Sequence, residues 1–338
     1  MRAGMARSFP LQFKALPCSA APGVRGASLH VRLIRGLPAV ADRPVALTVG
    51  NFDGVHRGHQ AMLARLSEAA DDLGLVPAVL TFDPHPREFF SSERAPPRLS
   101  SLRGKLEVLR AFGVERVYVA RFNRAFASLD PDLFVDDVLV RRLGARWVLV
   151  GEDFRFGRAR AGDLALLRRH ARRFSVESMG AVEVHGERAS STLVREALAS
   201  GDLAKATKFL GRPYAIGGHV AHGAKLGRTL GYPTANLPLK RRPALQGIFA
   251  VRVHGLGPPH RGVASLGVRP TVAHGGQPLL EVYLFDFDTP IYGRRIVVEF
   301  LHKLRDEARF PDLDSLTRQI RADADAARAF FAASRAAN

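Results

Sequence analysis

The first half of the chain alternates short apolar runs with amphipathic stretches. Residues 44–49 form a β-rich run, and apolar side chains then recur at helical spacing over residues 62–73 until Gly74. Further strand-like runs follow, each ending in polar and glycine residues: 76–82, 116–120 and 146–150. This repeated order of strand, polar loop and helix predicts an α/β fold with a doubly wound parallel sheet.

The pattern changes after a short helical connector at residues 201–213. Short apolar runs then follow closely, separated by glycine and proline: 214–220, 248–253, 262–266, 279–287 and 296–300. Because no helical stretch intervenes, these runs predict antiparallel strands in a small β-barrel. An amphipathic stretch at residues 313–331 predicts a helix packed on that barrel. The 338 residues therefore divide into two modules with their own cores, at 30–200 and 214–338.

The first 29 residues precede the recognisable pattern and carry only basic charges. We expect them to be a disordered tail or the product of an upstream start codon. Their composition superficially suits a transit peptide, but Lys14 interrupts the apolar core that a secretion signal needs. No run of about 18 apolar residues occurs, so no membrane span is predicted. The single cysteine, Cys18, cannot form an internal disulfide, which agrees with a cytoplasmic location.

The formal net charge of +18 is large enough to suggest a polyanionic partner. However, the basic residues are dispersed along the chain and are not interleaved with aromatic residues of the kind that stack on bases. The densest run, residues 168–173, lies in an alanine- and leucine-rich helical stretch and is interpreted as a solvated face. Nucleic-acid binding is therefore not expected, and steering of small anions is a simpler use of the charge.

Residues 48–59, Thr-Val-Gly-Asn-Phe-Asp-Gly-Val-His-Arg-Gly-His, lie where the first predicted strand meets the first helix. Backbone N–H groups and the dipole at a helix start favour an anion, and Gly50, Gly54 and Gly58 allow close approach. His56 and His59, in the same segment, can add hydrogen bonds or positive charge. The segment therefore predicts a phosphate site.

Two other interpretations of these histidines stay open. Any pair of histidines three residues apart can lie in a loop without a chemical role. The pair can also be half of a zinc site, for which Asp83 and His85 are the nearest further ligands. The strand, the helix and the three glycines around His56 and His59 favour phosphate.

The string GNFDGVHRGH at residues 50–59 resembles the HxGH signature of nucleotidyltransferases that transfer AMP or CMP from a nucleoside triphosphate. Taken whole, it is similar to the amino-terminal half of the bacterial bifunctional riboflavin kinase/FAD synthetase family, which implies a Rossmann-like sheet. The resemblance implies that His56 and His59 are catalytic and bind the triphosphate. It also implies that neighbouring residues belong to the ATP site: Gly50, Asn51, Phe52, Asp53, Gly54 and Gly58.

The resemblance continues at the ends of the later strands, where ligand sites of open α/β sheets gather. The segments Phe-Asp-Pro-His-Pro, Arg-Phe-Asn and Val-Gly-Glu-Asp-Phe-Arg-Phe-Gly match stretches that line the adenylyltransferase cleft in the family. The implied flavin-binding candidates are Phe82, His85 and Asn123. The implied ATP-binding candidates are Gly151, Asp153 and Phe154. For His85, a proline-rich turn is an equally good interpretation.

Residues 186–195 match the family's SSTxxR segment before a helix. A Ser-Ser-Thr run predicts a helix N-cap, whose hydroxyl and N–H groups can also hold phosphate. The implied ATP-binding candidates are Arg188, Ser190, Ser191, Thr192 and Arg195. Many relatives carry arginine where Leu193 stands, which leaves open a retargeted or silent adenylyltransferase beside a working kinase.

In the second module, the sequence Gly-Ala-Lys-Leu-Gly-Arg-Thr-Leu-Gly-Tyr-Pro-Thr-Ala-Asn occupies residues 223–236. A Walker P-loop is rejected because Lys225 falls one residue late and no Ser or Thr follows it. The stretch resembles the riboflavin kinase module, which implies that Thr234 and Asn236 contact Mg²⁺ and ATP phosphates. A glycine-rich ATP-binding flap is implied for Gly223, Lys225, Gly227, Arg228 and Gly231.

Glu281 lies among apolar residues in a predicted strand, so on its own it would be an outward charge on an edge strand. In the family the matching glutamate is the base that accepts the proton of the riboflavin 5′-hydroxyl. The closing Leu-Arg-Asp-Glu segment resembles one that shapes the flavin pocket, through Arg305 and Glu307. Ser265 stands where a common Asn precedes the GxRPT stretch.

The resemblance covers residues 30–335 and implies two-step FAD synthesis with ATP, riboflavin and FMN as substrates and Mg²⁺ as cofactor. Neither step needs a covalent enzyme intermediate. We expect a cytoplasmic protein that is a monomer or a weak homo-oligomer and binds no membrane or nucleic acid. A flavin- or nucleotide-binding regulator is the alternative from another class, which the retention of both sets of chemical residues disfavours.

Overall fold

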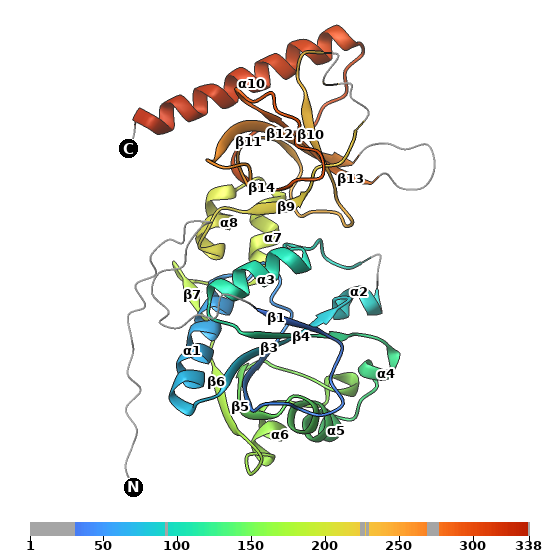
Figure 1. The fold of residues 1–338 in the computed structure, drawn as a ribbon, viewed down its shortest axis with the longest axis vertical. Coiled ribbons are helices and arrows are strands. Elements are labelled where there is room, and N and C mark those ends of the chain that lie inside the picture. Colours follow the sequence, from blue (N-terminus) through green and yellow to red (C-terminus); the bar gives the residue numbers. More distant parts are fainter. Residues whose placement is uncertain (1–30, 92–93, 224–226, 228–229, 269–276, 337–338) are drawn as a thin grey trace.

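The computed structural model describes residues 31–91, 94–223, 227, 230–268 and 277–336, so the expected tail at 1–29 lies outside the described residues. Within them the chain forms two six-stranded sheets and one two-stranded ribbon. Figure 1 shows the first sheet with its helices at one end of the molecule and the second sheet, curled under a long helix, at the other.

The first sheet has the strand order β1-β4-β3-β2-β5-β6, and every neighbouring pair is parallel. Its strands are β1 (Arg32–Arg35), β2 (Val45–Val49), β3 (Val76–Asp83), β4 (Arg116–Arg121), β5 (Ala145–Gly151) and β6 (Ser175–Met179). The predicted doubly wound parallel sheet is therefore confirmed. The sequence pattern missed β1 and β6, which are short, lie at the two edges of the sheet and contain at least as many polar as apolar residues.

Helices cover both faces of this sheet. The helices of this module are α1 (Arg57–Leu73), α2 (Pro86–Phe90), α3 (Leu102–Ala111), α4 (Arg124–Ala127), α5 (Pro131–Leu133), a π-helix (Phe134–Arg142), a 3₁₀ turn (Arg158–Arg160) and α6 (Leu164–Arg169). Two more helices, α7 (Ser191–Ala199) and α8 (Leu203–Leu210), follow before the barrel. Successive side chains of β2 enter opposite cores, because a strand alternates its faces. Val45 and Leu47 pack with the π-helix and α6, whereas Ala46 packs with α1.

The helix α1 ends where the sequence predicts. Gly74 takes a φ of 63°, the left-handed conformation that glycine adopts without steric cost, and it caps the helix. The chain then enters β3 directly, so β2, α1 and β3 form one parallel crossover unit. Farther along, β7 (Glu183–Val184) and β8 (Glu187–Arg188) pair as a small ribbon before α7.

The second sheet has the order β10-β13-β12-β11-β14-β9, and every neighbouring pair is antiparallel. Its strands are β9 (Ala215–His219), β10 (Thr234–Pro238), β11 (Gly247–His254), β12 (His260–Val268), β13 (Pro278–Leu284) and β14 (Arg295–Arg305). An isolated bridge between Ala221 and Asn236 joins the segment after β9 to β10 and nearly closes the barrel, as predicted.

Two strand limits differ from the sequence prediction. The expected strand at 279–287 ends at Leu284, because the chain turns there and Asp286 has a φ of 53°. The expected strand at 296–300 continues to Arg305, since β14 pairs with the whole length of β11. The strand β10 was not among the predicted strands, because its first residues were identified only as part of the motif at 223–236.

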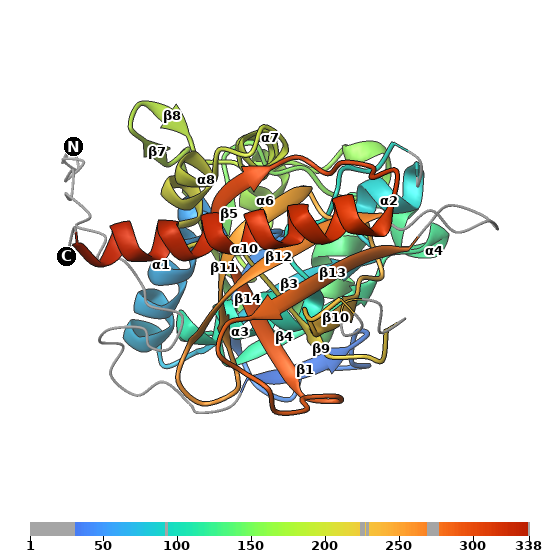
Figure 2. The same cartoon turned by 90° about the horizontal axis from the view of Figure 1, so that it is seen from above.

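The long helix α10 (Leu313–Ala336) lies across the outer face of the barrel, as Figure 2 shows from above. Its Ala324, Ala327 and Phe331 pack against Ile248 and Ala250 of β11. The inner face of the barrel shares one continuous core with α7 and α8, which lie between the two sheets in Figure 1. The two modules are thus packed together through these helices.

Polar contacts also join the modules. Arg212, after α8, donates to the carbonyls of Gly54 at 2.7 Å and Val55 at 3.2 Å. On the other side, Arg241 Nη1 lies 2.7 Å from Glu88 Oε2. Through Arg212, the connector therefore contacts the turn at residues 48–59 that is predicted to bind phosphate.

Candidate active sites

The turn between β2 and α1 has an unusual backbone. Phe52 and Val55 have φ values of 47° and 43°, in a region that costs a residue with a side chain about 1–3 kcal/mol. Donors from other segments hold the carbonyls of this turn: Thr81 on Asn51 at 3.2 Å, Ser191 on Asp53 at 2.9 Å, Arg212 on Gly54 at 2.7 Å and Gln60 on Val55 at 2.8 Å. These contacts maintain the strained conformation.

The amino terminus of α1 is left open for a ligand. His56 is the N-cap residue, but its side chain makes no capping hydrogen bond, and the first turn of α1 contains no acidic residue. The first N–H groups of a helix have no partner inside the helix, and with the helix dipole they favour an anion. The geometry thus agrees with a phosphate site at this position.

The rings of His56 and His59 stack on each other, with centroids 3.8 Å apart, and His59 also contacts the ring of Phe52 at 4.9 Å. Within the described part of the chain, the Nδ1 atoms of both histidines are buried without a hydrogen-bond partner. Two stacked imidazolium ions would repel each other, so this arrangement favours neutral rings.

Burial also favours the neutral form of these two rings. It lowers the pKa of His56 to about 4, against an opposing effect of Asp53, and it lowers the pKa of His59 well below its ordinary value. Both rings are therefore neutral at pH 7 before a ligand binds. They can contribute hydrogen bonds to a phosphate, not a standing positive charge.

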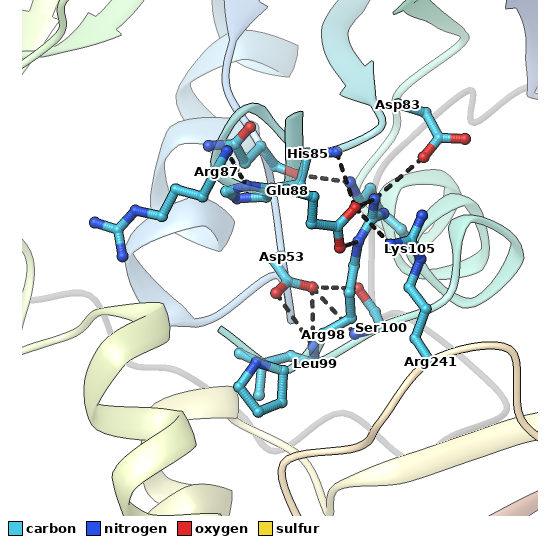
Figure 3. Close-up of polar contacts among 12 residues, drawn as sticks. Asp53, Asp83, His85, Arg87, Glu88, Arg98, Leu99, Ser100, Lys105 and Arg241 are labelled. Atoms are coloured by element: carbon cyan, nitrogen blue, oxygen red, sulfur yellow. Dashed lines mark hydrogen bonds and ion pairs between the residues drawn. The ribbon is translucent and has the colours of Figure 1, made fainter. Parts of the chain in front are cut away.

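Asp53 belongs to the same motif, but its carboxylate faces protein groups. It accepts hydrogen bonds from the backbone N–H groups of Leu99 and Ser100, each at 3.1 Å, as Figure 3 shows. Arg195 Nη2 lies 2.6 Å from its Oδ2, and only 4% of the Asp53 side chain is exposed. A buried carboxylate would repel a phosphate, so its geometry supports a positioning role for the turn.

The Ser-Ser-Thr segment lies beside the turn. Ser190 caps α7 by accepting from Leu193 N at 3.2 Å, and Ser191 reaches the turn through the Asp53 carbonyl. Thr192 is exposed at the start of α7. The Leu193 side chain packs against the core shared with the barrel, so its apolar character has a structural use.

Arg188 and Asp153 form an exposed ion pair, with Arg188 Nη2 2.6 Å from Asp153 Oδ2. Gly151 ends β5 close to this carboxylate, where an added Cβ would lie 3.1 Å from Asp153 Oδ1. Phe154 instead stacks on Phe156 and packs on the core of the first module. The structure thus brings together two of these candidates and gives Phe154 a packing role.

His85 follows β3 and begins α2. It accepts from Arg87 N at 3.1 Å while the side chain of Glu88 accepts from His85 N at 3.3 Å, a reciprocal helix cap. Burial lowers the pKa of His85 to about 4. Figure 3 shows Glu88 linked in turn to Arg98 and Arg241. The segment around His85 is therefore a proline-containing turn that caps α2, as one of the two interpretations of the sequence proposed.

Aromatic rings gather beside His85. Phe82 contacts the rings of Phe122 and Phe126, and Phe122 in turn contacts Phe89 and Phe90. Phe90 is 70% exposed, which is unusual for a ring of this size. Asn123, between these rings in sequence, caps α4. Phe89, Phe90 and Phe122 were not among the residues predicted from the sequence, although the paired Phe residues shortly after the Pro-His-Pro segment were a visible signal.

In the second module, strand pairing brings the predicted residues together. Asn236 on β10 lies directly opposite Glu281 on β13, and Ser265 on β12 lies opposite Glu281 on the other side. Directly opposed residues share a face of the sheet. The residues flanking Glu281 point into the barrel core, so Glu281 projects outward. However, β13 is paired on both sides, so the edge-strand interpretation is wrong.

The Thr-Ala-Asn strand has the oxygen atoms that a magnesium ion needs. Asn236 is buried, and its Oδ1 has no hydrogen-bond partner among the described residues, while its Nδ2 donates to Thr234 O at 3.1 Å. Mg²⁺ commonly takes one or two protein oxygens and completes its shell with phosphates and water. The described residues contain no group of three His, Cys, Asp or Glu that could hold a metal.

Two of the described glycines of the flap lie against this strand. A Cβ on Gly223 would lie 2.5 Å from Asn236 Nδ2, and one on Gly227 would lie 3.4 Å from Thr234 Oγ1. Gly231 has a φ of 85°. Lys225 and Arg228, also predicted here, lie outside the described residues.

A cavity of about 360 Å³ opens beside the strands β10 and β13. It is lined by Leu230, Gly231, Tyr232, Tyr283, Arg321, Ala324, Asp325 and Arg328. Tyr283 and Glu281 share a face of β13, two residues apart. The cavity therefore adjoins the residues that carry the predicted chemistry.

The two flavin candidates of this module have different surroundings. Arg305 pairs with Asp323 of α10 through two contacts of 2.8 and 2.6 Å, which anchors that helix. Glu307 lies against Gly267. Burial raises the pKa of Glu307, and the charge of Glu281 raises it further against the effect of Arg305. Glu307 is thus close enough to Glu281 for the charge of Glu281 to raise the pKa of Glu307.

A parallel α/β sheet with an HxGH turn, followed by a barrel with a Thr-Ala-Asn strand opposite a glutamate, defines a class of two-module enzymes that act on nucleotide phosphates. A family model described as FAD synthetase matches residues 39–193, and one described as riboflavin kinase matches residues 210–331. The chain belongs to the bifunctional riboflavin kinase/FMN adenylyltransferase family.

Two curated relatives carry that family name. One from Haemophilus influenzae is 46% identical over 308 residues, covering 89% of this chain and 99% of the relative. One from Pseudomonas fluorescens is 48% identical over 310 residues, covering 90% of this chain and 99% of the relative. The predicted family resemblance is therefore confirmed over both modules.

A crystal structure from Streptococcus pneumoniae, described as a macrolide-efflux protein, is similar with a TM-score of 0.74 and 30% identity. The similarity covers 88% of this chain and 98% of that one, so the two proteins share the arrangement of both modules.

Among the residues that the structure describes here, no helix combines the length and apolar character needed to cross a membrane.

Proposed function

We propose that this chain makes FAD from riboflavin in two steps. Residues 214–338 phosphorylate riboflavin to FMN with ATP, and residues 30–200 then transfer AMP from a second ATP to FMN. Family membership over both modules supports this assignment. The observation that carries the second step is the stacked pair of His56 and His59 at the open amino terminus of α1.

In the adenylyl transfer, a phosphate oxygen of FMN forms a bond to the α-phosphorus of ATP while the bond to pyrophosphate breaks. Negative charge develops on the leaving pyrophosphate. The N–H groups of α1 and the neutral imidazoles are placed to donate hydrogen bonds to that charge. Positioning and hydrogen bonding supply the rate enhancement, because no covalent intermediate is needed.

The aromatic cluster after β3 is the structural support for an FMN site. The exposed rings of Phe89 and Phe90, which meet edge to face at 73°, offer apolar surface to an isoalloxazine ring. This surface adjoins His85 at the carboxyl end of β3, where ligands of open α/β sheets bind. The flavin thus lies near the triphosphate site on the same edge of the sheet.

In the kinase step, the riboflavin 5′-hydroxyl attacks the γ-phosphorus and ADP leaves. Glu281 accepts the hydroxyl proton. Thr234 and Asn236 would hold Mg²⁺ through their oxygen atoms, and the ion would neutralise phosphate charge. The cavity beside Tyr232 and Tyr283 is available to a substrate.

We further propose that small molecules are the only partners needed for this activity, in a cytoplasmic protein that is a monomer or weak homo-oligomer. The dispersed basic residues support steering of ATP and flavin phosphates over nucleic-acid binding. The single cysteine supports a reducing compartment.

One incubation tests the two-step assignment. Purified protein is mixed with riboflavin, ATP and Mg²⁺, and the flavins are separated by chromatography at successive times. FMN should appear first and FAD should follow. Accumulation of FMN without FAD would contradict adenylyl transfer and support the silent form that Leu193 left open. Absence of both products would support a binding protein.

A further inference from the structure

Lys105 is a buried, charged side chain in contact with the HxGH turn. It lies in the first turns of α3 and is 4% exposed. A cation near a helix amino terminus is opposed by the helix dipole, and a buried ammonium loses its hydration. Two unfavourable conditions at one residue call for a compensating function.

The ammonium of Lys105 is directed at the turn. Its Nζ donates to the carbonyl of Asn51 at 2.5 Å and lies 3.3 Å from Thr81 Oγ1. Asn51 directly precedes Phe52, one of the strained residues of the turn. Lys105 therefore holds the entrance to the turn through the Asn51 carbonyl.

The partners of Lys105 are neutral oxygen atoms, and the described residues place no carboxylate within ion-pair distance of its Nζ. Carboxylates of Asp53, Asp83 and Glu88 act on it from farther away, and Figure 3 shows that these groups already have other partners. The charge of Lys105 is thus not fully compensated. It also acts on His59, whose pKa it helps to lower.

We propose that Lys105 is a positioning residue for adenylyl transfer, which fixes the Asn51 carbonyl behind the turn and places a buried positive charge behind His59 for the triphosphate. The inference rests on the proposed adenylyltransferase activity of this module. The charge compensates developing negative charge on pyrophosphate without contacting it, because electrostatic effects are long-ranged in a buried site.

The ionisation of Lys105 gives this role a measurable signature. Burial is the largest cause that lowers its pKa, to about 8; Arg98 acts in the same direction, whereas Asp53, Asp83 and Glu88 oppose it. Below pH 8 the ammonium is charged, and the charge is lost as the pH rises through that value. An arginine at this position would stay charged throughout the accessible range.

The experiment compares Lys105→Met, Lys105→Arg and wild type in the full-length protein. The measured quantities are kcat and kcat/KM for FMN adenylylation between pH 6.5 and about 9.5. We expect kcat of Lys105→Met to fall about 10- to 100-fold at pH 7. We expect kcat/KM of wild type to decline above about pH 8, and that of Lys105→Arg to show no such decline.

Three controls separate this inference from its alternatives. Riboflavin phosphorylation by the second module and thermal unfolding report whether each variant is folded. Arg103→Met removes a cation from the exposed side of the same helix and should leave adenylylation within about twofold of wild type, as expected for an exposed charge. Thr81→Val removes the other hydrogen bond to Asn51 O but keeps the charge.

The inference is overturned if Lys105→Met retains wild-type kcat. It is also overturned if Thr81→Val reproduces the loss in Lys105→Met while the alkaline limb is the same in wild type and Lys105→Arg, since that result describes a purely structural hydrogen bond. If wild type forms no FAD at all, the proposed function fails, and the role of Lys105 in adenylyl transfer, which rests on that function, fails with it.

Discussion

Arg195 and Asp53, which are 142 residues apart in the sequence, form a nearly buried ion pair with Arg195 Nη2 2.6 Å from Asp53 Oδ2. Arg195 also donates to the carbonyl of Pro97 at 2.7 Å, and Asp53 accepts from the backbone N–H groups of Leu99 and Ser100 in the same loop. One ion pair thus ties the Ser-Ser-Thr helix, the HxGH turn and the loop before α3 together.

Breaking this pair should destabilise the first module. Asp53→Asn keeps the shape but leaves the guanidinium without its counter-charge, so we expect the free energy of unfolding to fall by about 3 kcal/mol. Urea unfolding at pH 7 measures it. The control is Asp153→Asn, whose pair with Arg188 is exposed and should change stability by less than about 1 kcal/mol. Equal effects of the two substitutions would contradict the buried pair.

The neutral histidines predict a particular dependence of stability on pH. The pKa of His56 is about 4 in the folded protein and about 6.5 in the unfolded chain, so the unfolded state binds more protons between those values. The contribution of His56 to stability is therefore complete above pH 6.5 and is lost as the pH falls towards 4. Urea unfolding at pH 7, 6 and 5 should show this loss, and His56→Gln should reduce the slope. An unchanged slope would indicate that the pKa of His56 is the same in the folded and unfolded states.

The two modules should lose their activities separately. Glu281→Gln removes the proposed base and should lower riboflavin phosphorylation by about 100-fold or more, within the usual range for acid–base catalysis. The same variant should still convert supplied FMN to FAD. His59→Ala should show the opposite result and stop at FMN. Loss of both activities in either folded variant would contradict the assignment of one reaction to each module.

The connector should influence adenylylation through Arg212, which holds the carbonyls of Gly54 and Val55. In Arg212→Ala the turn loses these donors, and we expect kcat for FMN adenylylation to fall about 10-fold while riboflavin phosphorylation is retained. Arg295→Ala is the matched control, because Arg295 joins the modules through Glu107, away from the turn. A similar loss in both variants would point to general loosening of the module interface.

The sequence by itself determined the parts of this protein that depend on local pattern. Period-two and helical spacing were enough to identify β2, α1, β3 and most of the barrel strands, since side-chain periodicity is a property of neighbouring residues. Motif strings were enough to identify the family, because the string at 50–59 is contiguous. The short edge strands β1 and β6 were not predicted, since each contains at least as many polar as apolar positions.

The tertiary structure alone decided which distant residues meet. Strand register placed Asn236 opposite Glu281 and paired β13 on both sides, and chain crossing brought Arg195 onto Asp53. Nothing near Lys105 in the sequence shows that its ammonium lies under the HxGH turn. The physical reason is that periodicity reports which face a residue occupies, whereas contacts between segments depend on register and packing across the whole fold.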